Sequence, residues 1–149
     1  MSNFNIKEMV NEEVVELDYL ATDRDSAIRE AGNILVNNGC VSESYVDAMV
    51  ESCNKFGPYI VILPGLAIPH ANSDKGVNRV GISILRLKEP IVFGNKENDP
   101  VKIVIAVATP DSKSHLELLS NLSKILFDPK KLASMVDCNK KELIELFAR

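Results

Sequence analysis

Residues 101–109 read VKIVIAVAT, in which only Lys102 and Thr109 carry polar side chains. A run with so many β-branched and so few polar residues is typical of a strand in the middle of a sheet that is covered on both faces. Such a sheet needs helices on each side of it. The chain of 149 residues is long enough to bury it in one core, so we expect one domain over residues 1–149.

The rest of the chain shows the periodicities of further strands and helices. Strands are predicted at 14–19, 59–63, 66–71, 80–87 and 101–109, and helices at 22–38, 42–56, 114–126, from 129 and from 139. The predicted fold class is therefore α/β: a single-domain mixed β-sheet of about four or five strands with helices on both faces. The order of the strands does not follow from these patterns.

Capping-box patterns mark three of the predicted helix starts. The pairs are Thr22 with Asp25, Ser114 with Glu117, and Asn139 with Glu142, and residues 111–114 offer several N-cap candidates for the helix of the second pair. The second pair predicts that His115 lies in the first turn of its helix.

Charge and hydropathy exclude several classes of protein. The 17 basic and 21 acidic residues give a formal net charge of −4, and no basic stretch is long enough to follow a nucleic-acid backbone. The longest apolar stretch, residues 59–69, is interrupted by Pro64 and Gly65 and is too short to insert into a membrane. The N-terminal residues lack the pattern of an export signal, so we expect a cytoplasmic protein.

The three cysteines, Cys40, Cys53 and Cys138, are far apart and form no CxxC spacing. They are predicted to be reduced packing residues, with neither a disulfide set nor a zinc site. We expect no metal and no cofactor.

Two histidines are the main candidates for chemistry. His70 lies at the end of a predicted strand, and His115 lies in the first turn of a predicted helix, which are the places where sites gather in α/β folds. Neutral imidazole is a nucleophile at pH 7, and a helix N-terminus stabilises a phosphoryl group. An isolated histidine is more often an ordinary surface or core residue, so this pattern alone leaves the function open.

A longer pattern around His70 carries more information. The segment GLAIPHA, residues 65–71, closely resembles the active-site segment of the EIIA domains of the mannitol and fructose class of the sugar phosphotransferase system. Residues 45–49, YVDAM, and residues 115–123, HLELLSNLS, continue the resemblance. Nearly the whole chain is thereby similar to this family.

The resemblance implies a phosphotransferase component that carries phosphohistidine. His70 would accept a phosphoryl group from the phosphocarrier HPr, through Nε2, and pass it to an EIIB domain that serves the membrane transporter EIIC. His115 would support the phosphorylated histidine. The resemblance implies no cofactor, and it leaves the oligomeric state undetermined.

One departure from the mannitol-type pattern bears on the transported sugar. Where those proteins carry an Arg-Glu pair, this chain reads Ser52-Cys53. Residues 55–62, KFGPYIVI, are instead similar to the ascorbate-type EIIA subgroup. Ascorbate or a related sugar is therefore the expected cargo.

Two other functions stay open from the sequence. A free-standing regulatory phospho-acceptor of the same family would use the same histidine without serving a transporter. Metal-dependent hydrolysis with both histidines as ligands lacks HExxH and a carboxylate cluster. For the carrier, we expect an apolar partner surface to which Leu66, Ile68 and Ala71 contribute.

Overall fold

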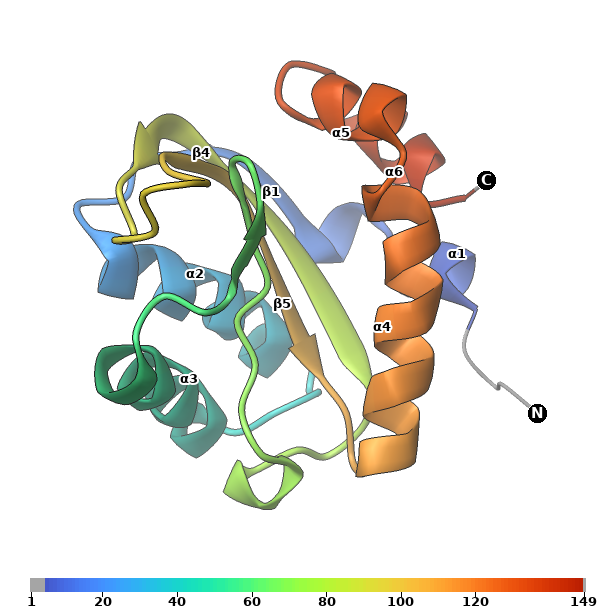
Figure 1. Cartoon of the computed structure of the whole chain (residues 1–149). Coiled ribbons are helices and arrows are strands. Elements are labelled where there is room, and N and C mark those ends of the chain that lie inside the picture. Colours follow the sequence, from blue (N-terminus) through green and yellow to red (C-terminus); the bar gives the residue numbers. More distant parts are fainter. Residues whose placement is uncertain (1–4, 149) are drawn as a thin grey trace.

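Five strands form one mixed sheet through the middle of the protein (Figure 1). The structure, a computed structural model, describes residues 5–148. The strands are β1 (Val15–Tyr19), β2 (Val61–Leu63), β3 (Leu66–Ala67), β4 (Gly81–Ile91) and β5 (Val101–Ala108), in the order β1-β4-β5-β3-β2. β1 with β4 and β3 with β5 are parallel pairs, whereas β4 with β5 and β2 with β3 are antiparallel. The predicted mixed sheet is confirmed.

Helices cover both faces of this sheet, as predicted (Figure 1). α2 (Arg24–Asn37) and α3 (Glu43–Phe56) lie on one face. The other face carries α1 (Ile6–Met9), α4 (Ser112–Leu126), α5 (Pro129–Met135) and α6 (Lys140–Leu146). The described residues also contain two short 3₁₀ helices, η1 (Glu12–Val14) and η2 (Ser73–Lys75). None of the helices within residues 5–148 is long and apolar enough to cross a membrane.

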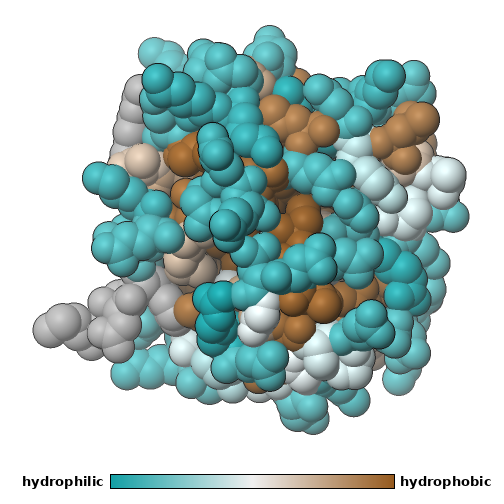
Figure 2. Space-filling model, turned by 180° about the vertical axis from the view of Figure 1, so that it is seen from behind, coloured by the Kyte–Doolittle hydropathy of each residue, from teal (hydrophilic) through white to brown (hydrophobic). Residues whose placement is uncertain are grey.

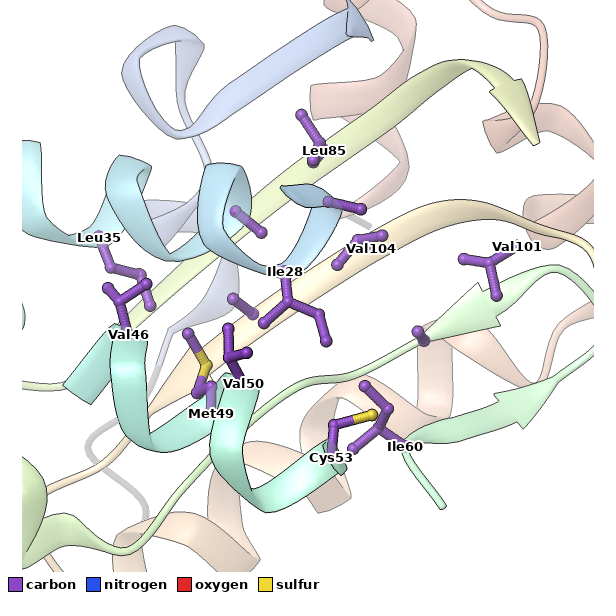
Figure 3. Close-up of a cluster of buried hydrophobic side chains, with 14 of the residues drawn as sticks. Ile28, Leu35, Val46, Met49, Val50, Cys53, Ile60, Leu85, Val101 and Val104 are labelled. Atoms are coloured by element: carbon purple, nitrogen blue, oxygen red, sulfur yellow. The ribbon is translucent and has the colours of Figure 1, made fainter. Parts of the chain in front are cut away.

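β5 is the central strand, and its side chains divide between two cores. Val104, Ala106 and Ala108 pack with residues of α2 and α3, some of which are shown in Figure 3. Ile103 and Val107 belong to the core beneath α4. Since successive strand residues point to opposite faces, a continuous apolar run is what two covered faces require.

Two helix starts differ from the predicted capping boxes. α2 is capped by Asp23, whose carboxylate accepts from the Ser26 backbone N–H at 2.8 Å, one residue later than predicted. α4 is capped by Asp111, which accepts from the Ser114 N–H at 2.7 Å, so the helix begins at Ser112 rather than near Ser114. An aspartate placed three residues before a free N–H is as good a cap as the serine or threonine that we favoured. The Asn139 box of α6 is confirmed.

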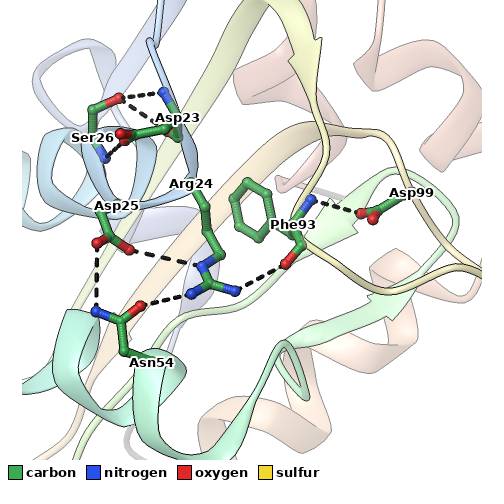
Figure 4. Close-up of polar contacts among 7 residues, drawn as sticks. All are labelled: Asp23, Arg24, Asp25, Ser26, Asn54, Phe93 and Asp99. Atoms are coloured by element: carbon green, nitrogen blue, oxygen red, sulfur yellow. Dashed lines mark hydrogen bonds and ion pairs between the residues drawn. The ribbon is translucent and has the colours of Figure 1, made fainter.

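A polar cluster holds the loop between β4 and β5 against the helices of the first face (Figure 4). The Arg24 guanidinium donates to the Phe93 carbonyl at 3.0 Å and to Asn54 Oδ1 at 2.6 Å, and it lies 3.7 Å from the Asp25 carboxylate. The Asp99 carboxylate accepts from the backbone N–H of Phe93 within the loop. The loop is thus fixed by charged hydrogen bonds as well as by packing.

The side of the protein seen in Figure 2 is largely hydrophilic, with apolar side chains in small areas separated by polar ones. Scattered apolar surface of this kind is ordinary for a folded domain.

Candidate functional site

The backbone on both sides of His70 is held by three hydrogen bonds. The Ile68 N–H donates to the Ile60 carbonyl at 2.8 Å, and the Pro69 carbonyl accepts from the Val107 N–H at 3.2 Å. The Ala71 N–H donates to the Tyr45 hydroxyl at 3.1 Å. His70 therefore continues the line of β3 along the end of β5, in a short segment that has little freedom to move.

The His70 ring has a defined tautomer. Its Nδ1 lies 2.9 Å from the carbonyl oxygen of Ile68. A carbonyl oxygen only accepts, so Nδ1 of this half-buried ring carries the hydrogen and donates it. In the neutral ring, Nε2 then holds the lone pair, and no residue within 5–148 forms a hydrogen bond with it. The free nitrogen is the nucleophilic one.

The rings of His115 and His70 lie side by side. The ring centroids are 5.0 Å apart, and the ring planes are tilted by 47°. β3 and β5 are parallel, so their carboxyl ends reach the same edge of the sheet, where α4 begins soon after β5. His115 Nδ1 lies 3.3 Å from the hydroxyl of the buried Thr109. The strand end and the helix start thus place one imidazole against the other.

Burial lowers the pKa of His115 below its ordinary value of 6.5, and the neighbouring charge of His70 lowers it further. His115 is therefore expected to titrate below pH 6.5 and to be neutral at pH 7. The unfolded chain binds this proton more readily than the folded one, so the contribution of His115 to stability is present above pH 6.5 and is lost as the pH falls.

An NMR pH titration of the ring signals measures this shift. Unfolding by urea at pH 7.5 and at lower pH, in wild type and in His115→Gln, isolates the contribution of His115 to stability. A His115 midpoint at or above 6.5 would contradict the burial argument.

Tyr45 is a site residue whose role the sequence did not indicate. Its buried hydroxyl donates to the Val107 carbonyl at 2.7 Å and accepts from the Ala71 N–H, so it joins β5 to the residue after His70. Burial raises the pKa of Tyr45 to about 12, which keeps the hydroxyl proton in place. The sequence showed Tyr45 only as an apolar position of a helix and as part of a family-like segment.

Depressions on two sides of His70 differ in charge. One lies against α3 and η2 and contains Lys55 and Lys75, with Glu51 as its acidic residue. The other lies at the start of α4 and contains His115, with Asp74 and Asp111 as its charged carboxylates. His70 is thus accessible between a surface that carries lysines and one that carries the second imidazole.

Two of the three side chains expected in the apolar partner surface, Leu66 and Ile68, are buried in the core. Leu66 is 0% exposed and Ile68 is 4% exposed, because both point into the core beneath α4. Ala71 is half-buried and lines both depressions. Leu66 lies in the buried strand β3 and Ile68 directly follows it, so both are buried. The pattern LAIPHA alone does not show this burial.

Other apolar side chains are exposed in the depressions and the groove that His70 lines. We call them the apolar rim, and they are Phe56, Tyr59, Ile62, Leu116 and Phe127. Tyr59, Ile62 and Phe127 line an apolar groove that also includes His70. Phe127 is 61% exposed and Leu116 is 70% exposed. Exposed apolar residues that gather on one part of a surface are typical of an interaction site.

The position of the mannitol-type arginine is occupied by a hydrogen-bonded serine. The Ser52 hydroxyl lies 2.8 Å from the hydroxyl of Tyr59, and Cys53 is buried in the core. Cys40 is also buried, Cys138 is half-buried, and all three cysteines are free thiols. Within residues 5–148, no three His, Cys, Asp or Glu side chains gather where a metal ion would bind.

Comparison with known proteins gives a family match over nearly the whole chain. Residues 8–149 match the family described as phosphoenolpyruvate-dependent sugar phosphotransferase system, EIIA 2. The ascorbate-specific PTS system EIIA component of Escherichia coli K12 is 31% identical over 137 residues, which cover 91% of this chain and 89% of that protein.

Two solved structures share the fold. The mannitol-specific cryptic phosphotransferase enzyme IIA CmtB of Escherichia coli has a TM-score of 0.88 at 27% identity, covering 98% of this chain and 99% of the other. The complex of enzyme IIAMTL with phosphorylated enzyme IIBMTL, also from Escherichia coli, contains a chain with a TM-score of 0.82 at 26% identity, covering 93% and 96%. The chain therefore belongs to the EIIA 2 family of the phosphoenolpyruvate-dependent sugar phosphotransferase system.

Proposed function

We propose that the protein carries a phosphoryl group on Nε2 of His70, which it accepts from HPr and transfers to an EIIB partner. The observation that carries this proposal is the hydrogen bond from His70 Nδ1 to the Ile68 carbonyl. It fixes the tautomer in which Nε2 is the nucleophile. Membership of the EIIA 2 family supports the direction of transfer.

The chemical step moves one phosphoryl group between two imidazoles. The Nε2 lone pair of neutral His70 attacks phosphorus, and the phosphorus–nitrogen bond of the donor breaks. The electron pair of that bond stays on the donor ring, which leaves as neutral imidazole if its second nitrogen is protonated. The His70 ring gains the positive charge, and the Ile68 carbonyl that accepts from Nδ1–H stabilises it.

His115 fits the role of a hydrogen-bond donor to the phosphoryl group. Its lowered pKa favours the neutral ring, in which only one nitrogen carries hydrogen. When the Thr109 hydroxyl donates to Nδ1, that hydrogen is on Nε2. A donor placed beside the reacting group stabilises charge as the phosphoryl group arrives.

The test is incubation with phosphoenolpyruvate, Enzyme I and HPr, followed by intact-mass analysis. We expect one acid-labile phosphoryl adduct per chain. Subsequent loss of that adduct to an EIIB protein separates the transport carrier from a free-standing regulatory phospho-acceptor. A protein that gains no adduct in this mixture would contradict the proposal.

Ascorbate is the proposed cargo of the complete system. The support is the 31% identity to the ascorbate-specific component of Escherichia coli and the absence of an arginine at position 52. Transfer rates to an ascorbate-type and a mannitol-type EIIB distinguish the two cargoes. A faster transfer to the mannitol-type EIIB would contradict this part of the proposal.

We propose the apolar rim as the contact surface for EIIB, and Phe127→Ser tests it. Because Phe127 is exposed in the groove that His70 also lines, its loss removes partner contact without opening the core. The KM for EIIB is expected to rise about 10-fold while the maximal transfer rate stays near wild type. Val136→Ser, which removes an exposed side chain after α5, is the matched control. Equal KM values for the two variants would argue against this surface.

A further inference from the structure

We propose that Lys55 and Lys75 together bind the phosphoryl group on His70, in place of the arginine that mannitol-type proteins carry at the position of Ser52. This inference rests on the proposed function, since it assigns the groups that contact the phosphoryl oxygens. The lysines would be direct contacts of the transferred group rather than positioning residues.

The first support is that both lysines line the same depression as His70. Lys55 comes from the last turn of α3, and Lys75 comes from η2. Two elements far apart in sequence thus bring positive charge to one side of the nucleophile. Both side chains are exposed, so their flexible stems can carry the ammonium groups toward a bound oxyanion.

The second support is the face of α3 that looks into this depression. Its lining residues are Ala48, Glu51, Ser52, Lys55 and Phe56. They follow the i, i+3, i+4, i+7 spacing of one helix face. Lys55 therefore lies about one turn after position 52 on the same face. Compared with the mannitol-type arginine, the positive charge is thus about one turn further along α3, on the helix face that lines the depression.

The third support is the charge balance around the two lysines. Neither lysine forms an ion pair with any residue in the range 5–148. Glu51 is the acidic residue of the depression, and Lys55 and Lys75 are its cations. An arriving dianionic phosphoryl group would therefore meet ammonium groups that are not already neutralised.

The other side of His70 does not supply such charge. The depression at the start of α4 contains Asp74 and Asp111 and has no lysine or arginine in its lining. The Asp111 carboxylate caps α4 and accepts from the Ser114 N–H, and that bond holds its pKa below the usual range. A phosphoryl group on His70 would thus lie between a neutral donor, His115, and the two lysines.

The experiment measures single-turnover phosphoryl transfer from phosphorylated HPr over a range of HPr concentrations. In Lys55→Met/Lys75→Met, we expect the rate at saturating donor to fall about 10–100-fold. Lys55→Arg/Lys75→Arg should instead keep most of the wild-type rate, because guanidinium groups also bind phosphoryl oxygens. Glu51→Gln removes the opposing charge and should equal or exceed the wild-type rate.

Lys141→Met, in α6, is the matched control and should leave the rate unchanged. It removes an exposed lysine from a helix that packs near β1, at the far edge of the sheet from β3. Wild type that takes no phosphoryl group would refute the proposed function itself. If wild type is phosphorylated and the Met/Met variant keeps its saturating rate, with or without a raised KM, the inference is overturned.

Discussion

Replacing His70 by glutamine is expected to abolish phosphoryl acceptance. Glutamine keeps a polar side chain of similar length but has no nitrogen lone pair able to attack phosphorus. The structure shows no other imidazole with its Nδ1 held by a backbone carbonyl among residues 5–148. The rate should fall by at least about 1000-fold, which intact-mass analysis after incubation with HPr records as the absence of an adduct.

His115→Gln is the control for this experiment. Because His115 is proposed as a hydrogen-bond donor and glutamine also donates, this variant should still gain the adduct, with the rate lowered about 10–100-fold. Charge and local geometry around the site change little in both variants. An adduct on His70→Gln, or its loss only in His115→Gln, would reverse the roles that we assign.

Tyr45→Phe is expected to give the second large effect, on stability and on transfer together. The change removes one oxygen atom and leaves the Val107 carbonyl and the Ala71 N–H without their hydrogen-bond partner. Burying these unsatisfied groups should cost about 2–4 kcal/mol of the free energy of unfolding. The segment after His70 also loses an anchor, so transfer should slow about 10-fold.

Urea unfolding and the HPr transfer assay measure these two effects of Tyr45→Phe. The matched control is Tyr19→Phe on β1, because the hydroxyl of this half-buried residue forms no hydrogen bond with any residue of the range 5–148. The control should change the free energy of unfolding by less than about 0.5 kcal/mol. Equal stabilities of the two variants would show that the Tyr45 hydroxyl is not a structural link.

Much of the fold was predictable because local patterns dominate in a covered sheet. The run at 101–109 became β5, and the helix predicted after Ser42 runs from Glu43 to Phe56 and ends before Gly57. At Gly57 the backbone has φ +88°, a conformation that glycine adopts readily. The predicted starts of α2 and α4 were wrong because several residues that can cap a helix are adjacent there.

The site was predictable only in part, because its members meet through tertiary structure. The family-like segment singled out His70, and the helix pattern put His115 in the first turn of a helix, whereas the closeness of the two rings is seen only in the structure. In the sequence, Tyr45 is only one apolar position of a helix. Nothing near it in the chain shows that its hydroxyl reaches β5. Leu66 and Ile68 looked exposed beside a loop, whereas the pairing of β3 with β5 buries them. Strand order decides both outcomes, and no local pattern contains it.

The most direct test of the central claim is to identify the phosphorylated nitrogen by NMR. Wild type labelled with ¹⁵N is phosphorylated with phosphoenolpyruvate, Enzyme I and HPr, and long-range ¹H–¹⁵N correlations of both histidine rings are recorded. The account predicts a phosphoryl group on Nε2 of His70, with Nδ1 still protonated toward the Ile68 carbonyl. A phosphoryl group on Nδ1 of His70, or on His115, would contradict it.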